Sequence, residues 1–417
     1  MKTVKVDGER LWASLMEMGR IGETPGGGCR RLALTDEDKA ARDLFCRWAR
    51  DAGCTITVDG IGNIFARRDG TDPDAAPVMI GSHLDTVPTG GKFDGVYGVL
   101  AGLEVVRRLN DLDIATSAPI EIVVWTNEEG ARFSPMTLGS SVFTGDIALD
   151  FALSRTDPEG VTIAEALERI DYAGNEPIGG RPVGTYFEVH VEQGPLLKEG
   201  GERIGAVTGS FMARYFVATV TGEAAHVGPT LMEQRHDALV GAAALTLEID
   251  RIGRSRGREG RSNAPHIELF PNVRGVIPSE VRLSCDLRNS DPAELAKMEQ
   301  DLQAAIARIE GERGVSIALE PYFEFGPIRF DAAMSGLISE TAREIGLSCR
   351  DILTVAGHDA VPMTTCCPTA LFFIPSDTGI SHNETEYSTP EQCVDGADVL
   401  LNAVLRIASV EVVPPSN

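Results

Sequence analysis

Short apolar strands that alternate with helical patterns constrain the fold of this chain most strongly. Three such runs are Thr55–Val58, Pro77–Ser82 and Ile120–Thr126. Continuous apolar strands are typical of a mostly parallel sheet that helices cover on both faces. The segment from Gly95 to Asn110 predicts the helix that connects two of these strands. The expected fold class is therefore α/β.

The pattern changes near Phe211, where a β-α-β-β-α-β order begins that is typical of ferredoxin-like domains. Its expected elements are strand Phe211–Gly222, helix Asp237–Ile252, strand Ala264–Phe270, strand Ser279–Arg288, helix Pro292–Glu310 and strand Val315–Pro321. After Phe330 the α/β pattern returns, with strand Thr369–Ile374 and a closing helix Val394–Ala408. A chain of 417 residues also exceeds the usual size of a single core. We therefore expect a first domain over residues 1–210 and 329–417, interrupted by a second domain over residues 211–328.

Composition excludes several classes of protein. The net charge of −24 argues against binding to nucleic acid, which needs clustered Lys and Arg. No apolar run is near the roughly 18 residues that a membrane span requires, and the N-terminus lacks the apolar core of a signal peptide. The eight cysteines are scattered without a C-x-x-C pair, which favours reduced thiols over disulfides or a thiolate metal site. We expect a cytoplasmic protein.

Acidic residues and a histidine collect directly after two predicted strands. His83, Asp85 and Asp94 follow the strand Pro77–Ser82, and the adjacent pair Glu128 and Glu129 follows the next strand. Sites in open α/β sheets form at the carboxyl ends of the strands. Two adjacent carboxylates repel each other unless a cation holds one of them, which leaves the other free to carry a proton.

Two more histidines lie in polar segments rich in turn residues. His190 occurs in "TYFEVHVEQGP", and His382 occurs in "TGISHNETEY" soon after the strand Thr369–Ile374. A single histidine is more often structural than functional. Strand-end histidines together with three strand-end acids indicate a metal centre.

Six segments taken together resemble the motif set of one enzyme family. They are "GSHLDTV…GGKFDGVYGVLAG", "NEEGARF", "HVEQGPLL", "AHVGPTLMEQRHDA", "AGHDA" and "GISHNETEY". In this order they are similar to the amidase, hydantoinase/carbamoylase branch of the M20 metallopeptidase family, and the resemblance runs from about Leu11 to Ile407. It implies an aminopeptidase-like catalytic domain with a ferredoxin-like lid over residues 211–328, which also forms a homodimer.

The resemblance implies two divalent metal ions per subunit. His83 and His190 would hold one ion, Glu129 and His382 would hold the other, and Asp94 would bridge both. Imidazole and carboxylate ligands without thiolate suit Zn²⁺, Mn²⁺, Co²⁺ or Ni²⁺, and zinc or manganese is expected first.

The resemblance also assigns roles near the metals. Glu128 would be the general base, and Asp85 would determine the tautomer of the His83 imidazole. His226 would polarise the scissile carbonyl and stabilise its oxyanion. The positions that match substrate-binding residues of relatives are Gln193, His226, Arg288 and Gly357.

Three positions leave alternatives open. Arg288 would clamp an α-carboxylate with two hydrogen bonds, or it is a solvated charge at a strand end. His358 either lines the site or braces its loop. The segment "PNVRGVIPSE" places Gly275 where relatives usually carry a substrate-binding Asn, and Asn272 lies three residues earlier.

The expected function is hydrolysis of the N-carbamoyl (ureido) group of an L-amino acid or a related small ureide, with release of ammonia and carbon dioxide. Allantoate amidohydrolase and β-ureidopropionase are the alternatives within the same branch. A dipeptidase is less well supported, because "HVEQGP" marks the carbamoylase-type branch. A non-catalytic binding protein on this scaffold would lack a metal ligand or the general base. The five ligand residues and Glu128 are all present.

Overall fold

The computed structural model describes residues 3–408, and the chain forms two compact units. The first unit comprises Met1–Thr208, Phe330–Ile352 and Ala356–Asn417, and the second comprises Gly209–Arg329 and Leu353–Val355. The sequence did not associate Leu353–Val355 with the inserted segment. The outermost parts of the expected first domain, residues 1–2 and 409–417, lie outside the described residues.

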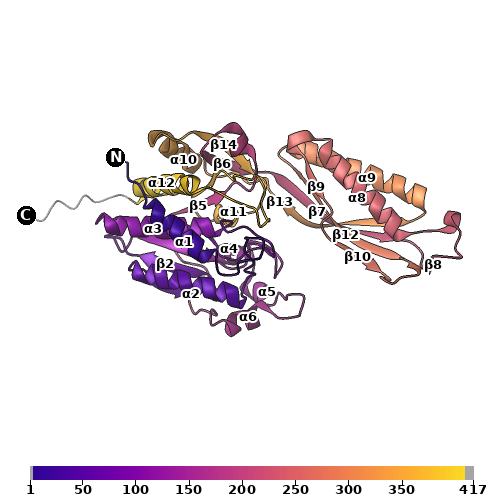
Figure 1. Ribbon diagram of the computed structural model, residues 1–417, viewed down its shortest axis with the longest axis horizontal. Helices are drawn as coiled ribbons and strands as arrows, with labels where there is room; N and C mark the ends of the chain where they lie inside the picture. The colour runs from indigo at the N-terminus through magenta and orange to yellow at the C-terminus, as the bar shows by residue number, and fades with distance from the viewer. Residues whose placement is uncertain (1–2, 409–417) are drawn as a thin grey trace, which may run out of the picture. The chain divides into compact units, whose positions relative to one another are not determined.

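An eight-stranded sheet forms the centre of the first unit, in the order β1-β2-β4-β3-β5-β15-β6-β14. Figure 1 labels β2, β5, β6 and β14 of this sheet. Its strands are β1 (Thr55–Val58), β2 (Ile64–Arg68), β3 (Val78–His83), β4 (Ile120–Trp125), β5 (Thr185–Val191), β6 (Ile204–Ser210), β14 (Cys349–Thr354) and β15 (Thr369–Ile374). The four central strands β4, β3, β5 and β15 are parallel, and β2 and β6 flank them antiparallel. The predicted α/β class with a largely parallel sheet is confirmed.

Helices surround this sheet in two layers. Its helices are α1 (Gly8–Met18), α2 (Asp36–Asp51), α3 (Val96–Asp111), α4 (Leu138–Thr144), α5 (Leu149–Leu153), α6 (Ile163–Arg169), α7 (Leu196–Gly200), α10 (Ala332–Glu344), α11 (Ala360–Met363) and α12 (Pro390–Ile407). Helices α1, α3, α10 and α12 pack together, whereas α4 and α11 pack on each other and on the central strands. Strands β3, β4 and β15 are buried along their whole length, which explains their continuous apolar sequences.

Local sequence determines where several of these elements begin. Thr35 caps α2 by accepting a hydrogen bond from the Asp38 amide. The closing helix begins at Pro390 rather than at the expected Val394, because Thr389 and Gln392 form a capping box there. Strand β2 was not expected from the sequence, since its apolar run is only three residues long.

The second unit has the β-α-β-β-α-β order that the sequence predicts. Its elements are β7 (Met212–Thr221), β8 (Ala225–His226), η1 (Met232–Gln234), α8 (Ala238–Arg254), η2 (Gly257–Glu259), β9 (Arg261–Asn263), β10 (Ile267–Phe270), β11 (Val276–Ile277), β12 (Glu280–Asn289), α9 (Pro292–Arg313) and β13 (Ser316–Phe325). The main sheet is antiparallel in the order β10-β12-β7-β13, and α8 and α9 pack on it around a separate apolar core. A separate two-stranded sheet pairs β8 with β11 and so places His226 beside Val276.

The state of the cysteines and the apolar character of the helices can be compared with the expectations from the sequence. All eight cysteines are free thiols, and five of them are buried. This agrees with the expectation of reduced thiols. Among residues 3–408, no helix combines the length and the apolar character that a membrane crossing requires.

Candidate metal centre

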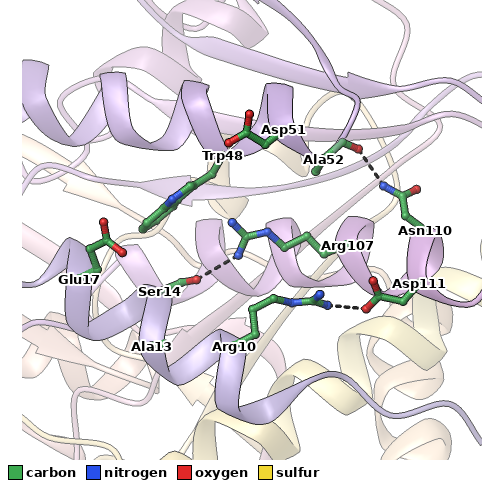
Figure 2. A pocket seen from close by; sticks show the side chains of 10 residues that line it. All are labelled: Arg10, Ala13, Ser14, Glu17, Trp48, Asp51, Ala52, Arg107, Asn110 and Asp111. Carbon is green, nitrogen blue, oxygen red and sulfur yellow. Dashed lines mark hydrogen bonds and ion pairs between the residues drawn. The ribbon is translucent and has the colours of Figure 1, made fainter.

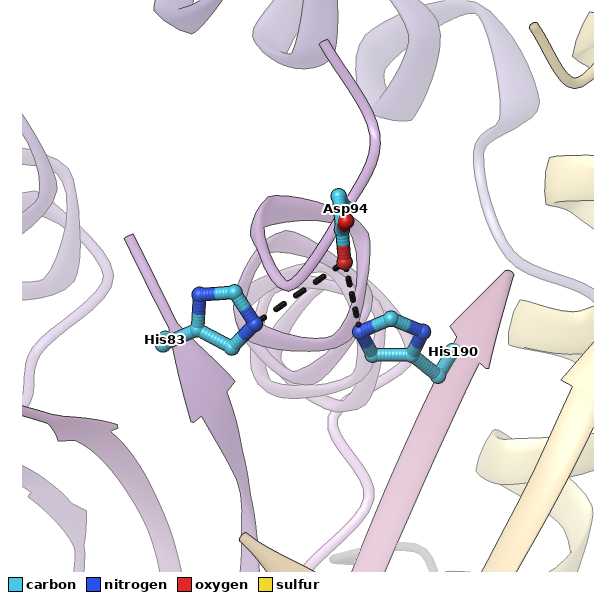
Figure 3. Close-up of side chains that lie close together, drawn as sticks. All are labelled: His83, Asp94 and His190. Carbon is cyan, nitrogen blue, oxygen red and sulfur yellow. Dashed lines mark ion pairs between the residues drawn. The ribbon is translucent and has the colours of Figure 1, made fainter. Parts of the chain in front are cut away.

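The first group of candidate ligands lies at the ends of two adjacent strands. His83 is the last residue of β3, His190 lies on the neighbouring β5, and Asp94 directly precedes α3. Oδ1 of Asp94 lies 3.1 Å from Nε2 of His190 and 3.9 Å from Nε2 of His83. Figure 3 shows that both imidazoles point at this carboxylate. All three side chains are buried.

Hydrogen bonds set the tautomers of both buried imidazoles. Nδ1 of His83 lies 2.9 Å from the carbonyl oxygen of Asp85, and Nδ1 of His190 lies 2.9 Å from that of Val191. A carbonyl oxygen only accepts, so in the neutral form of each imidazole Nδ1 carries the proton and Nε2 has a free lone pair. The Gly95 amide donates to Nε2 of His190, which agrees with this assignment. Both imidazoles therefore have the tautomer that a metal ligand needs.

Gly95 is required by the close packing of this group. Its φ is +67°, and a Cβ at this position would lie 2.4 Å from the His83 ring. Any other residue would displace the imidazole. The glycine that follows Asp94 therefore allows the helix α3 to begin directly against the candidate ligands.

The second group of candidate ligands surrounds the other oxygen of the same aspartate. Nε2 of His382 lies 3.3 Å from Oε2 of Glu129 and 3.6 Å from Oδ2 of Asp94. The ligand atoms of each group lie within 4.8 Å of one another. His382 has a φ of +53°, and such unfavourable backbone angles concentrate at functional sites. The structure thus brings all five expected ligands together, and Asp94 belongs to both groups.

Electrostatics at these two groups favour bound cations. Although burial opposes it, the contacts of Asp94 with His190 and His83 lower the pKa of Asp94 well below its ordinary value. Asp94 in turn raises the pKa of His190 to about 9 against the effect of burial, and the hydrogen bond with Glu129 raises that of His382 to about 9. Nearby positive charge therefore stabilises these carboxylates, and a divalent metal ion would supply it. The residues fit such an ion.

Glu128 lies beside the ligands and has an unusual environment. Its Oε2 lies 3.5 Å from Nε2 of His83, and its buried Oε1 has no hydrogen-bond partner in the described part of the chain. Burial raises the pKa of Glu128 well above its ordinary value, and the nearby carboxylates of Asp359 and Glu129 raise it further. A carboxylate in this setting binds a proton readily.

The structure shows which atom of Asp85 reaches the His83 imidazole. The main-chain carbonyl of Asp85, rather than its carboxylate, determines the tautomer of His83, since the carboxylate lies 4.0 Å from Nδ1. The carboxylate instead accepts hydrogen bonds from the amides of Glu128 and Glu129, each at 3.3 Å. Asp85 therefore orients the turn that carries these two glutamates.

Two expected substrate-binding residues lie in the first unit. Nε2 of Gln193 donates to both oxygens of Asp94, at 3.2 and 3.0 Å, and its buried Oε1 has no hydrogen-bond partner in the described part of the chain. At Gly357 a Cβ would lie 2.4 Å from the terminal methyl of Met136. Glycine therefore permits the close approach of Met136 at this position.

The other two expected residues, His226 and Arg288, belong to the second unit. Nδ1 of His226 accepts a hydrogen bond from the Gly228 amide, so the exposed imidazole carries its proton on Nε2 and can donate it. Arg288 is not a solvated charge. It pairs with Asp286 through Nε and Nη2 and donates from Nη1 to the Val355 carbonyl, which leaves two of its N–H groups open.

Known proteins with similar sequences identify the family of this chain. The model of peptidase family M20/M25/M40 matches residues 79–406. The chain belongs to this family. N-carbamoyl-L-amino-acid amidohydrolase of Rhizobium meliloti is 42% identical over 406 residues, with 97% of this chain and 98% of the relative covered. Allantoate amidohydrolase of Bacillus subtilis is 31% identical over 394 residues, with 94% and 95% covered.

A solved structure is also similar over the full length. The crystal structure of an amidase of the hydantoinase/carbamoylase family from Burkholderia vietnamiensis has 50% identity and a TM-score of 0.92, with 98% of this chain and 99% of that chain covered. The resemblance inferred from the motifs is therefore confirmed. This M20/M25/M40 protein is an amidohydrolase, an enzyme that cleaves C–N bonds, of a metal-dependent family.

The M20/M25/M40 site contains residues that the sequence analysis missed or left open. Glu188 lies two residues before His190 on β5, and its buried carboxylate accepts hydrogen bonds from the Ser82 hydroxyl and the Ala360 amide. The ring of His358 packs against that of His190, with centroids 4.6 Å apart, so His358 lies directly against a candidate metal ligand. The i, i+2 spacing in "EVH" could have identified Glu188, because alternate residues of a strand share a face.

Proposed function

We propose that this chain is a dinuclear metal amidohydrolase that hydrolyses the N-carbamoyl group of an L-amino acid or a related small ureide. One observation carries the proposal: a single aspartate, Asp94, belongs to two adjacent groups of ligand-type residues. The name of the Rhizobium meliloti relative supports the N-carbamoyl amino acid as substrate. The allantoate amidohydrolase of Bacillus subtilis supports allantoate as the second candidate.

We assign the ligands to two metal positions. His83 and His190 would hold one ion, Glu129 and His382 would hold the other, and Asp94 would contribute to both positions. When bound, two divalent cations, zinc or manganese first and cobalt or nickel as alternatives, would polarise the ureido group and lower the pKa of a water molecule. The free Nε2 lone pairs of the two buried imidazoles support this assignment.

The side chains around the metals carry the proton transfers. The water oxygen bonds to the ureido carbon while its proton passes to the carboxylate of Glu128. Glu128 then gives this proton to the departing ammonia nitrogen as the first C–N bond breaks. The carbamic acid that remains on the amino acid nitrogen loses carbon dioxide as the second C–N bond breaks, its proton moves to that nitrogen, and the free amine is left. The raised pKa of Glu128 suits a group that must hold a proton between these two steps. His226 donates from Nε2 to the ureido oxygen as negative charge develops there.

Substrate recognition is proposed for four positions. The two open N–H groups of Arg288 suit the α-carboxylate of an amino acid derivative. Gln193 offers an amide beside Asp94, and Gly357 would contact the substrate through its main chain. His226 contacts the ureido oxygen.

Ammonia release tests this function directly. Initial rates of ammonia release should be measured over N-carbamoyl-L-amino acids, their D-enantiomers, allantoate and 3-ureidopropionate. Cleavage of a dipeptide, which yields no ammonia, should be measured by the release of free amino acids. The largest kcat/KM is expected for an N-carbamoyl-L-amino acid. Allantoate as the best substrate would favour the second candidate, whereas preferential cleavage of the dipeptide would contradict both.

We also propose that the second unit is a lid and that the chain forms a homodimer through it in the cytoplasm. Large apolar side chains of this unit are exposed, notably Met232, Leu247 and Phe270 at 74%, 72% and 69%. Exposed apolar side chains of this size are typical of surfaces that another molecule covers. Light scattering coupled to size-exclusion chromatography measures the mass in solution, and a monomer at micromolar concentration would contradict the dimer.

Replacement of His226 by alanine tests the contribution of the second unit to the chemistry. His226 is exposed on a short strand, so His226→Ala should fold and bind metal normally. Loss of one donor to an oxyanion typically lowers kcat by about 10²–10³-fold. His236→Ala, in the same unit but outside the proposed site, is the matched control. A His226→Ala enzyme with the kcat of the wild type would remove this residue from the mechanism.

Replacement of Gly275 by asparagine tests whether this position determines specificity. A Cβ at Gly275 meets no atom within 4 Å, but its φ of +89° disfavours other residues, so the melting temperature must be checked first. Asparagine would add a donor and an acceptor close to β8, since the Gly275 carbonyl already accepts from the Val227 amide. Turnover of small N-carbamoyl amino acids should improve and that of the best natural substrate should fall, with a change in kcat/KM of about 10- to 150-fold. An unchanged substrate profile in a stable Gly275→Asn protein would contradict this role.

A further inference from the structure

A cavity of about 390 Å³ lies among helices α1, α2 and α3 of the first unit. The side chains that matter for its chemistry are Arg10, Ser14, Glu17, Trp48, Asp51 and Arg107 (Figure 2). Helix α3 begins at Val96, next to the metal centre, and its rise of about 1.5 Å per residue places Arg107 about 16 Å further along the axis. The cavity is therefore separate from the catalytic site.

Arg107 is the unusual residue of this cavity. Its Nη1 donates to Oγ of Ser14 at 3.0 Å, and its guanidinium carbon lies 5.5 Å from the centroid of the Trp48 ring. Within residues 3–408 it forms no ion pair and no other hydrogen bond, so four of its five N–H groups remain open. Burial lowers the pKa of Arg107, and the carboxylates of Glu104, Asp51 and Asp111 act against this shift. The side chain is thus half-buried, and among the described residues no carboxylate forms an ion pair with it.

The other charges of the cavity are distributed unevenly. The charge of Arg10 is balanced by two carboxylates, because its Nε and Nη2 donate to Glu104 and its Nη2 also donates to Asp111 at 2.8 Å. The side-chain carboxylates of Glu17 and Asp51 have no hydrogen bond and no ion pair in the part of the chain that the structure describes. Two free carboxylates and one free guanidinium therefore line the same space.

These charges match a ligand that carries both signs. A carboxylate would take two hydrogen bonds from the open fork of Arg107. An ammonium group would lie against Glu17 or Asp51, and an apolar side chain would contact Trp48. A volume of about 390 Å³ lies within the usual range for small-molecule sites.

We propose that this cavity binds a zwitterionic α-amino acid at a site distinct from the catalytic centre. Arg107 binds its carboxylate, and Glu17 and Asp51 bind its ammonium group. The proposed reaction also yields an amino acid, but this proposal stands on the charges of the cavity alone. Its test can therefore fail or succeed independently of the proposed function.

Tryptophan fluorescence of the metal-loaded enzyme is the direct readout, because Trp48 lines the cavity. L-Leucine is the probe, and 4-methylpentanoate and 3-methylbutylamine are matched compounds that lack the ammonium or the carboxylate. A saturable change is expected with L-leucine, and each matched compound should bind about 10-fold more weakly or worse. The change should disappear in Trp48→Phe. No response to L-leucine, or equally tight binding of 4-methylpentanoate, would overturn the proposal.

Arg107→Gln should weaken L-leucine binding by about 10-fold or more and leave kcat and KM for N-carbamoyl substrates unchanged. Arg108→Gln is the matched control, since Arg108 lies on the same helix but donates to the Lys5 carbonyl. Equal affinity in the two variants would overturn the proposal. If Arg107→Gln does not fold, the exposed pair Glu17→Gln and Asp51→Asn provides a second test. That double variant should lose its preference for L-leucine over 4-methylpentanoate, and a retained preference would overturn the proposal.

Discussion

Glu128→Gln is expected to retain its metal and to lose about 10²–10⁴-fold in kcat, the usual contribution of a general acid–base group. The glutamine keeps the shape of the side chain but cannot take a proton from water. The structure motivates this expectation, because Glu128 is buried beside His83 and burial raises its pKa well above the ordinary value. Metal content by elemental analysis and steady-state kinetics measure the two effects separately.

Glu129→Gln is the matched control for this prediction. Glu129 differs from Glu128 by one position and lies 3.3 Å from Nε2 of His382, in the second group of candidate ligands. Its substitution should therefore lower metal content, and activity should recover in part when excess metal is added. If Glu128→Gln lost metal and Glu129→Gln retained it, the two roles would be reversed.

The fold could be predicted from the sequence wherever burial determines the pattern. Strands β3, β4 and β15 are buried on both faces, so their sequences are continuously apolar and were recognised. Strand β2 was missed because its last two residues are arginines and because it pairs antiparallel beside the parallel strands. The contact of Leu353–Val355 with the second unit depends on tertiary structure that no local pattern encodes.

Several features of the site could not be predicted from the spacing of its residues in the sequence. Asp85 lies two residues after His83, and this spacing allows either its carbonyl or its carboxylate to reach the imidazole; the structure selects the carbonyl. The pairing of Arg288 with Asp286 could have been predicted from the sequence, since residues two apart on a strand share a face. Position at strand ends singled out the five candidate ligands together with Asp85 and Glu128, and the resemblance to the family separated the ligands from these two residues.

Removal of metal is expected to abolish hydrolysis and to lower the melting temperature. The carboxylates of Asp94, Glu128 and Glu129 are all buried near one another, and without cations they must bind protons or repel each other. Ligand binding at a concentration of 100 times Kd stabilises a folded protein by about 2.7 kcal/mol, so chelation should remove stabilisation of this order per site. Zn²⁺, Mn²⁺, Co²⁺ or Ni²⁺ should restore both activity and stability.

Two substitutions make this prediction specific to the shared aspartate. Asp94 belongs to both groups of ligands, whereas His382 belongs to only one. Asp94→Asn should therefore lose both ions, and His382→Ala should lose one ion while the pair His83 and His190 retains the other. Equal metal content in the two variants would contradict the bridging role. Full activity in a preparation that elemental analysis shows to be free of metal would contradict the mechanism as a whole, because the chain then needs no cation to balance the carboxylates it buries.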